Sequence, residues 1–164
     1  MKPITFSCTE TLPLAPEEIT RQIHDLGNWT GFIGYGVLPG IKAAEFEVRT
    51  PGVVGTRIRV TNTDGSSHVE EVVEWEPDRR LRLDMTDFTP PLSRLATKLE
   101  EAWEFERLGD GTRVVRSLGI YPKSPIARPV LWLISLLLRQ AISRHLRQMR
   151  EKPGGADDSS TSAG

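Results

Sequence analysis

Apolar and polar residues alternate along most of this chain, which is the pattern of half-buried β-strands. In the first such stretch, residues 4–12, Ile4, Phe6 and Cys8 alternate with threonine and serine. The same alternation predicts six further strands, at residues 44–49, 55–63, 68–76, 81–85, 98–108 and 112–121. The turns between the later strands are short, so consecutive strands should pair antiparallel. The stretch 88–97 contains a double proline and is predicted to be a loop.

The apolar period changes from two to 3.6 near the end of the chain. From residue 128 to 151, apolar side chains recur at i, i+3, i+4 and i+7. This predicts one helix of roughly 35 Å, long enough to cross a small domain. A short helical region between the first two strands is indicated by Pro16, Glu17 and Glu18, and Gly27 ends it. We therefore expect one α+β domain over residues 1–151, followed by a disordered tail at 152–164 that lacks large apolar residues.

Composition excludes several classes of protein. The 164 residues include 21 basic and 22 acidic side chains, so no basic excess indicates a nucleic-acid partner. Cys8 is the single cysteine, which rules out an internal disulfide, and the first residues lack the apolar run of a signal peptide. We therefore expect a cytoplasmic protein. The most apolar run, residues 129–138, is about half as long as a membrane span requires.

The order and spacing of several stretches resemble the START-like superfamily, also called SRPBCC, and within it the polyketide cyclase/dehydrase branch. These stretches are LAPEEITRQIHDLGNW, LPGIKAAEFE, GTRIRV, EEVVEWEPDRRLRL, WEFERLGDGTRVV and ISRHLRQM. The resemblance covers residues 3–150. It implies a helix-grip fold, in which a curved seven-stranded antiparallel sheet surrounds the long C-terminal helix and leaves a ligand cavity. Members of this superfamily range from enzymes to carriers, so the fold alone does not decide the function.

Metal and cofactor sites are not indicated by the sequence. His24, His68 and His145 are far apart and belong to no metal-binding motif, so we interpret them as three unrelated histidines. Cys8 lies on an alternating strand, where a small core residue is expected. The glycine-rich stretch 31–40 has no strand before it or helix after it, which excludes a dinucleotide fingerprint and favours a mobile loop at the cavity mouth. We therefore expect no metal and no cofactor.

Three charged residues occur on otherwise apolar strand faces. Period-two geometry directs Glu71, Glu101 and Arg116 toward the long helix. Buried charges need partners, and Glu101 and Arg116 lie on the two strands of one hairpin, where they are expected to pair. Two interpretations remain open: a structural ion pair at the cavity rim, or a pair that orients a polar group of an apolar ligand. The full set of candidate cavity residues is Phe46, Ile58, Glu71, Val73, Leu83, Glu101, Trp103, Arg116, Leu118 and Leu137.

Three functions are compatible with these features. The first is binding of a small hydrophobic molecule, such as a lipid, polyketide or isoprenoid. The second is a cyclase/dehydrase-type enzyme that uses Glu71 or Glu101 as general base and Arg116 to stabilise an enolate. The third is a chaperone-cofactor or protein-interaction role. The ligand and the oligomeric state do not follow from the sequence.

The outer face of the long helix suggests a further contact. Trp132 and Leu136 lie one turn apart next to Arg139, and several more arginines follow. This pattern predicts either transient contact with an anionic membrane or a homodimer. The alternative is that the first strand or the 88–97 loop covers Trp132.

Overall fold

The computed structural model describes residues 1–152, so the predicted tail lies outside the described residues except for Lys152. Its elements follow the predicted order closely. They are β1 (Ile4–Leu12), α1 (Pro16–His24), the 3-10 helix η1 (Leu26–Gly31), β2 (Ile41–Val48), β3 (Arg57–Asn62), β4 (Ser67–Glu76), β5 (Arg80–Thr86), α2 (Leu92–Leu95), β6 (Ala96–Leu108), β7 (Gly111–Pro122) and α3 (Arg128–Glu151).

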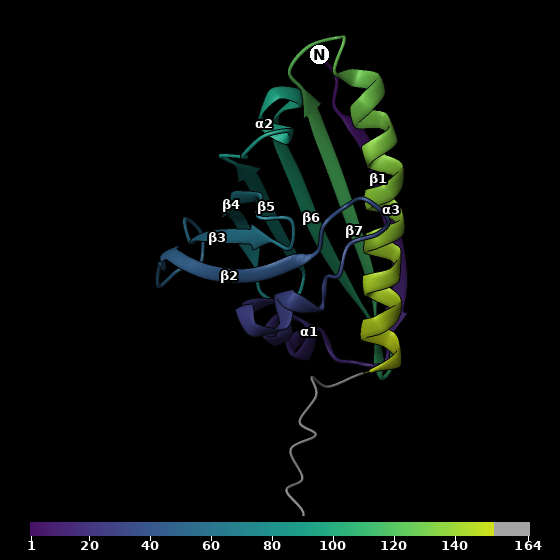
Figure 1. Cartoon of the computed structure of the whole chain (residues 1–164). Coiled ribbons are helices and arrows are strands. Elements are labelled where there is room, and N and C mark those ends of the chain that lie inside the picture. Colours follow the sequence, from purple (N-terminus) through teal and green to yellow (C-terminus); the bar gives the residue numbers. More distant parts are fainter. Residues whose placement is uncertain (153–164) are drawn as a thin grey trace, which may run out of the picture.

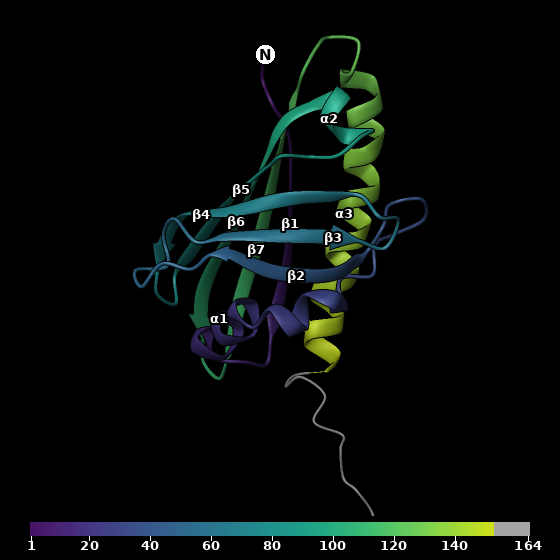
Figure 2. The same ribbon diagram turned by 60° about the vertical axis from the view of Figure 1, so that its left-hand side comes forward.

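The strands form one antiparallel sheet in the order β1-β7-β6-β5-β4-β3-β2. β1 joins the sheet beside β7, so the first and last strands of the chain are neighbours. The sheet twists strongly, and β2 and β3 cross the direction of β6 and β7 steeply (Figures 1 and 2). This is the helix-grip fold that the sequence predicts.

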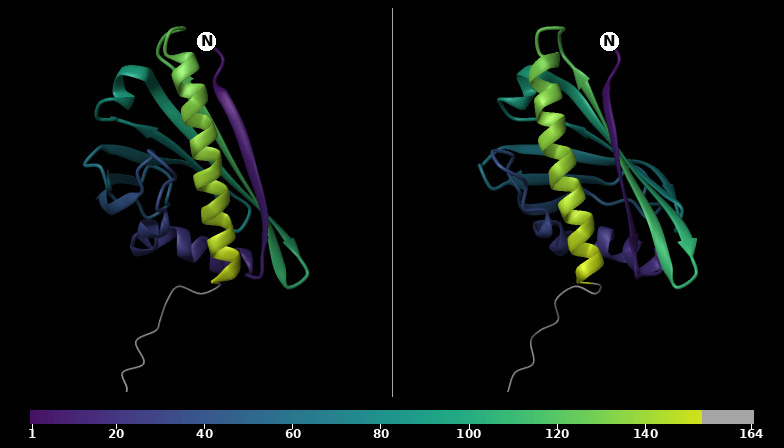
Figure 3. Two further views of the ribbon diagram at one scale, coloured as in Figure 1. Left: turned by 45° about the vertical axis from the view of Figure 1, so that its right-hand side comes forward. Right: turned by 90° about the vertical axis from the view of Figure 1, so that its right-hand side faces the viewer.

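α3 packs on one end of the curved sheet. It lies along β1 and next to β7 (Figure 3), while β2 to β5 bend away from it. Side chains at helical spacing fill the contact, and Leu131, Ile142 and Leu146 are almost fully buried. Because one straight helix cannot contact every strand of so curved a sheet, space remains between α3 and the central strands. No helix within residues 1–152 has the length and apolar content to cross a bilayer.

The segments at the open end of this space differ in part from the prediction. The stretch 88–97 is not entirely a loop, because residues 92–95 form the short helix α2. The glycine-rich segment between η1 and β2 makes a tight turn in which Tyr35 and Leu38 exchange two backbone hydrogen bonds, of 3.1 and 3.0 Å. Gly34 has φ of +76°, and a Cβ there would lie 2.2 Å from the Leu38 carbonyl oxygen. Only glycine fits this position without strain.

Candidate ligand-binding site

An apolar cavity of about 350 Å³ lies between the sheet and the first half of α3. Its walls come from five places: the inner faces of β4 to β7, α3, the 32–40 segment, the β3–β4 turn and the segment leading into α2. Typical lining residues are Leu38, Leu92, Leu118, Leu131 and Ile142. The volume is within the range of small-molecule sites in proteins.

A second hollow of about 420 Å³ continues from the inner end of the cavity toward η1 and the end of α3. The two spaces share Phe32, Ile41, Glu70, Glu101 and Arg116. Polar side chains thus gather where the two hollows meet, and the rest of the lining is mostly apolar.

The predicted pairing of Glu101 with Arg116 is present. Arg116 Nε donates a hydrogen bond to Glu101 Oε1, and only 3% of Glu101 is exposed. In the β6–β7 register Trp103 lies opposite Arg116, so Glu101 is the diagonal neighbour of Arg116 on the same face. The guanidinium also lies over the Trp103 ring, 4.4 Å from its centroid. The pair is therefore compensated both by charge and by an aromatic face.

His145 on α3 completes this polar group from the helix side. Its Nδ1 lies 3.2 Å from Arg116 Nη1, and because a guanidinium only donates, Nδ1 is the acceptor. Burial, followed by the positive charge of Arg116, lowers the pKa of His145 from 6.5 to about 3. The imidazole is therefore neutral at physiological pH and carries its proton on Nε2. Among residues 1–152, no side chain or backbone group hydrogen-bonds to that Nε2, and His145 lines the second hollow.

Two carboxyl groups, those of Glu70 and Glu101, lie where the two hollows meet, a region that we call the polar junction. Glu70 is buried, and its Oε1 lies 3.0 Å from His68 Nε2. Burial raises the pKa of Glu101; the charge of Arg116 opposes this, and the Glu70 carboxylate adds to it. Groups able to take or give a proton therefore face an otherwise apolar space.

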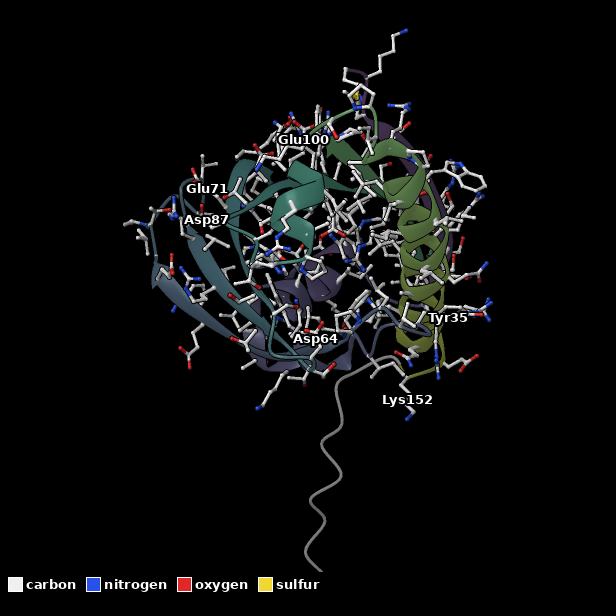
Figure 4. The ribbon with its side chains drawn as sticks, turned by 45° about the horizontal axis from the view of Figure 1, so that its top comes forward. Tyr35, Asp64, Glu71, Asp87, Glu100 and Lys152 are labelled. Atoms are coloured by element: carbon white, nitrogen blue, oxygen red, sulfur yellow. The ribbon has the colours of Figure 1, made fainter. Side chains whose placement is uncertain are left out.

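Glu71 and Val73, predicted from the sequence to line the cavity, are on the opposite face of the sheet. Glu71 is bound to Arg57 at 3.4 Å, its side chain is 41% exposed, and Val73 is 37% exposed. Figure 4 shows Glu71 at the edge of the molecule far from α3. A bulge between Val72 and Glu74 in the pairing with β5 breaks the alternation of β4. Because Trp75 beyond the bulge packs on the core, counting back from it in steps of two selects the wrong face, and Glu70 points inward instead of Glu71.

The other candidate residues divide between three hollows. Leu118 and Leu137 line the 350 Å³ cavity, and Trp103 lines the second hollow. Phe46 and Ile58 line a separate hollow of about 430 Å³ under α1 and η1, and Leu83 contributes to that hollow and to the second one. The residues predicted from the sequence to line one cavity therefore line three distinct hollows.

The three histidines have different surroundings. His68 bonds to Glu70 and lines the first cavity, and His145 bonds to Arg116 and lines the second hollow. His24 lies elsewhere, with its ring centroid 4.7 Å from that of Trp75. Within residues 1–152, no three side chains of the metal-binding types lie together. A signal for His145 was available in the sequence, because it lies one turn beyond Ala141 and next to Leu146 on the buried stripe of the helix.

Comparison with known proteins gives one family. The model of the family described as "Polyketide cyclase / dehydrase and lipid transport" matches residues 3–152, nearly the whole chain. The protein belongs to this family. No curated protein sequence matches the chain.

Solved structures of the family's fold are similar throughout their length. A protein of Thermus thermophilus is 22% identical with a TM-score of 0.68, and 90% of this chain covers 95% of that one. A START superfamily protein from Mycobacterium smegmatis is 16% identical with a TM-score of 0.62, with 88% and 98% covered. The major latex-like protein 151 of Panax ginseng is 13% identical with a TM-score of 0.59, with 93% and 100% covered. At these identities the likeness establishes the fold.

Proposed function

We propose that this protein binds one small, mostly apolar and electrically neutral molecule between the sheet and α3, with a hydroxyl or carbonyl group of the ligand at the polar junction. The main support for the proposal is an apolar cavity with one cluster of buried polar residues at its inner end. Membership of a family described in part by lipid transport supports it. Lipids, polyketides and isoprenoids with one such group all fit this description.

The charges of the junction argue for a neutral ligand. The Arg116 guanidinium is already paired with Glu101, so a ligand carboxylate would enter beside Glu70 and Glu101 without a free cation. A ligand ammonium would lose its hydration next to Arg116. A neutral carbonyl or hydroxyl avoids both costs, and it can accept a hydrogen bond from the Nε2 proton of His145.

A displacement assay tests this selectivity. A neutral fluorescent probe such as 1-aminoanthracene is bound first, and 1-decanol, 2-decanone, decanoate and decylamine then compete for it. We expect the alcohol and the ketone to displace the probe at least about tenfold better than decanoate, whose carboxylate would be buried without a free cation, and better than decylamine, whose ammonium would be buried beside the Arg116 guanidinium. Equal displacement by decanoate would contradict the proposal.

A matched pair of variants locates the binding. Leu137 is half-buried in the cavity wall, so Leu137→Trp should fill the cavity with little cost to the core, and we expect it to lose probe binding. Val73→Trp adds the same side chain on the outer face of the sheet and should bind the probe like the parent. Both variants should melt near the parent temperature. Unchanged binding by a folded Leu137→Trp variant would show that the probe binds elsewhere.

Acid–base catalysis in the same cavity is the second candidate, and Glu70 favours it. The cyclase/dehydrase interpretation needs a carboxylate that faces the cavity without being consumed by Arg116, and Glu70 meets this condition better than Glu101 or the outward-facing Glu71. Exchange of the α-protons of bound 2-decanone in deuterated water, followed by NMR, tests it. Exchange that is lost in Glu70→Gln, with probe binding retained, would support catalysis, and no exchange above the buffer rate would oppose it.

A further inference from the structure

The first half of α3 exposes an unusual number of large apolar side chains. Trp132 is 53% exposed and Ile126, just before the helix, is 88% exposed. Neither β1 nor the 88–97 segment covers Trp132, which excludes the alternative left open by the sequence. We call this surface the apolar arc; its members are Ile126, Val130, Trp132, Leu133 and Leu136.

The same side of α3 becomes basic farther along. Arg139 follows Leu136 by three residues, and Arg144 and Arg147 lie on the next turns, all of them exposed. None of these three arginines has an ion-pair partner within residues 1–152, although Arg150 pairs with Glu10. We call Arg139, Arg144 and Arg147 the arginine stripe.

Acidic residues are missing from this part of the chain. Between Gly119 and Arg150 there is no aspartate or glutamate, although the whole chain carries 22 acidic residues and a net charge of −1. The positive charge is therefore segregated onto α3, and the compensating negative charge lies on other elements. This segregation of charge favours a negatively charged partner that contacts α3 along its length.

The apolar arc adjoins the mouth of the cavity. Leu131 and Ile134, on the turns between its members, line the cavity, and Val37 at the tip of the 32–40 segment lines it from the other side while being 91% exposed. That segment reaches α3 at Leu137, and Figure 4 shows Tyr35 beside the helix. The lining includes one carboxylate at the rim, Asp64 of the β3–β4 turn.

We propose that the apolar arc and the arginine stripe together dock this protein on an anionic phospholipid bilayer, with α3 lying along the surface and the cavity mouth facing the lipid. The apolar arc enters the boundary between headgroups and acyl chains, and the arginine stripe contacts anionic headgroups. A bilayer supplies the negative charge that the arginine stripe lacks. A second copy of the chain would bring a second acid-free helix to the contact, which favours the membrane over a homodimer.

The docking proposal rests on the exposure of the apolar arc and on the charge of the arginine stripe. It does not depend on the proposed function. Only one consequence rests on that function: an apolar ligand would pass between bilayer and cavity without crossing water. The experiment therefore measures docking and ligand transfer separately, so that one can fail without the other.

Co-sedimentation with vesicles tests docking. The full-length protein is mixed with phosphatidylcholine vesicles, with or without about 30 mol% phosphatidylglycerol, at low salt and again at about 0.5 M salt. We expect binding only to the anionic vesicles, and a marked loss at high salt because the arginines are exposed. Absence of binding at low salt would overturn the proposal, and so would equal binding to the neutral vesicles.

Paired variants assign the contact to α3. Trp132→Ser should weaken partitioning by about tenfold through lost apolar burial, and the double variant Arg144→Glu/Arg147→Glu by about twentyfold or more, at about fivefold per arginine. The controls place one serine and one glutamate on other surfaces: Val73→Ser on the outer face of the sheet, and Arg79→Glu on the exposed β4–β5 turn. Both controls should bind like the parent. Equal loss in the controls and in the α3 variants would refute the assignment.

Two more measurements separate the remaining outcomes. Analytical ultracentrifugation that shows a dimer dispersed by Trp132→Ser, with no vesicle binding, would overturn membrane docking and identify the apolar arc as a dimer interface. Transfer of 1-aminoanthracene from vesicles to the protein tests the link to the cavity. A parent that sediments with anionic vesicles but takes up no probe would refute the proposed function and leave docking intact.

Discussion

The neutral His145 makes a specific prediction about stability and pH. Its folded-state pKa is about 3, against 6.5 for an unperturbed histidine. A depressed pKa means that the unfolded chain binds the proton first, so the stabilisation is complete above pH 6.5 and is lost as the pH falls toward 3. Between about pH 7.5 and pH 5, this one group should remove about 2 kcal/mol from the free energy of unfolding, from 1.36 kcal/mol per pH unit.

The variant His145→Asn isolates this contribution. Its amide oxygen can occupy the position of Nδ1 and accept the hydrogen bond from Arg116, but asparagine does not titrate. Other groups titrate in the same range, and they are common to both proteins. His24, whose pKa is lowered by burial and then by Arg49, acts in the same direction, and Glu101, whose pKa is raised, acts in the opposite one. The difference between parent and variant therefore reports His145.

Urea unfolding followed by tryptophan fluorescence supplies the measurement. The parent should lose about 2 kcal/mol more than His145→Asn between about pH 7.5 and pH 5, whatever the absolute stability of the variant. Gln148→Asn, one turn along α3, should keep the parent's pH dependence. If the parent and His145→Asn lose stability in parallel, His145 is not held neutral in the folded protein.

Three further predictions concern single positions, and urea unfolding at neutral pH measures each. Glu101→Gln should cost about 3–5 kcal/mol, because it leaves the Arg116 guanidinium, which cannot lose its proton, without a counter-charge; an unchanged midpoint would place Glu101 in water. Glu71→Gln should change the free energy of unfolding by less than about 0.5 kcal/mol, since the ion pair of Glu71 with Arg57 is exposed. A large loss of stability would show that Glu71 is buried. Gly34→Ala should destabilise by about 2 kcal/mol or more, because φ is +76° and the new Cβ would meet the Leu38 carbonyl at 2.2 Å; an unchanged midpoint would mean that the mouth segment rearranges freely.

Much of the fold was determined by local pattern in the sequence. The alternation of residues 4–12 and the helical period of residues 128–151 predict β1 and α3 with the bounds that the structure has. The pairing of Glu101 with Arg116 also followed from the sequence. A short turn sets the register of a hairpin, and unbroken alternation then sets which side chains share a face.

Tertiary structure decided what local pattern does not encode. The bulge in β4 places Glu70 rather than Glu71 inside, because one extra residue reverses the face of every side chain on the far side of it. Glu70 and His145 are 75 residues apart in sequence, and only the packing of α3 against the curved sheet places both in the lining of the second hollow. The exposure of Trp132 was likewise open, since an apolar residue on a helix is buried or not according to which other elements reach it. Local periodicity predicts the direction in which a side chain points. Only the packing of distant segments determines which residues that side chain contacts.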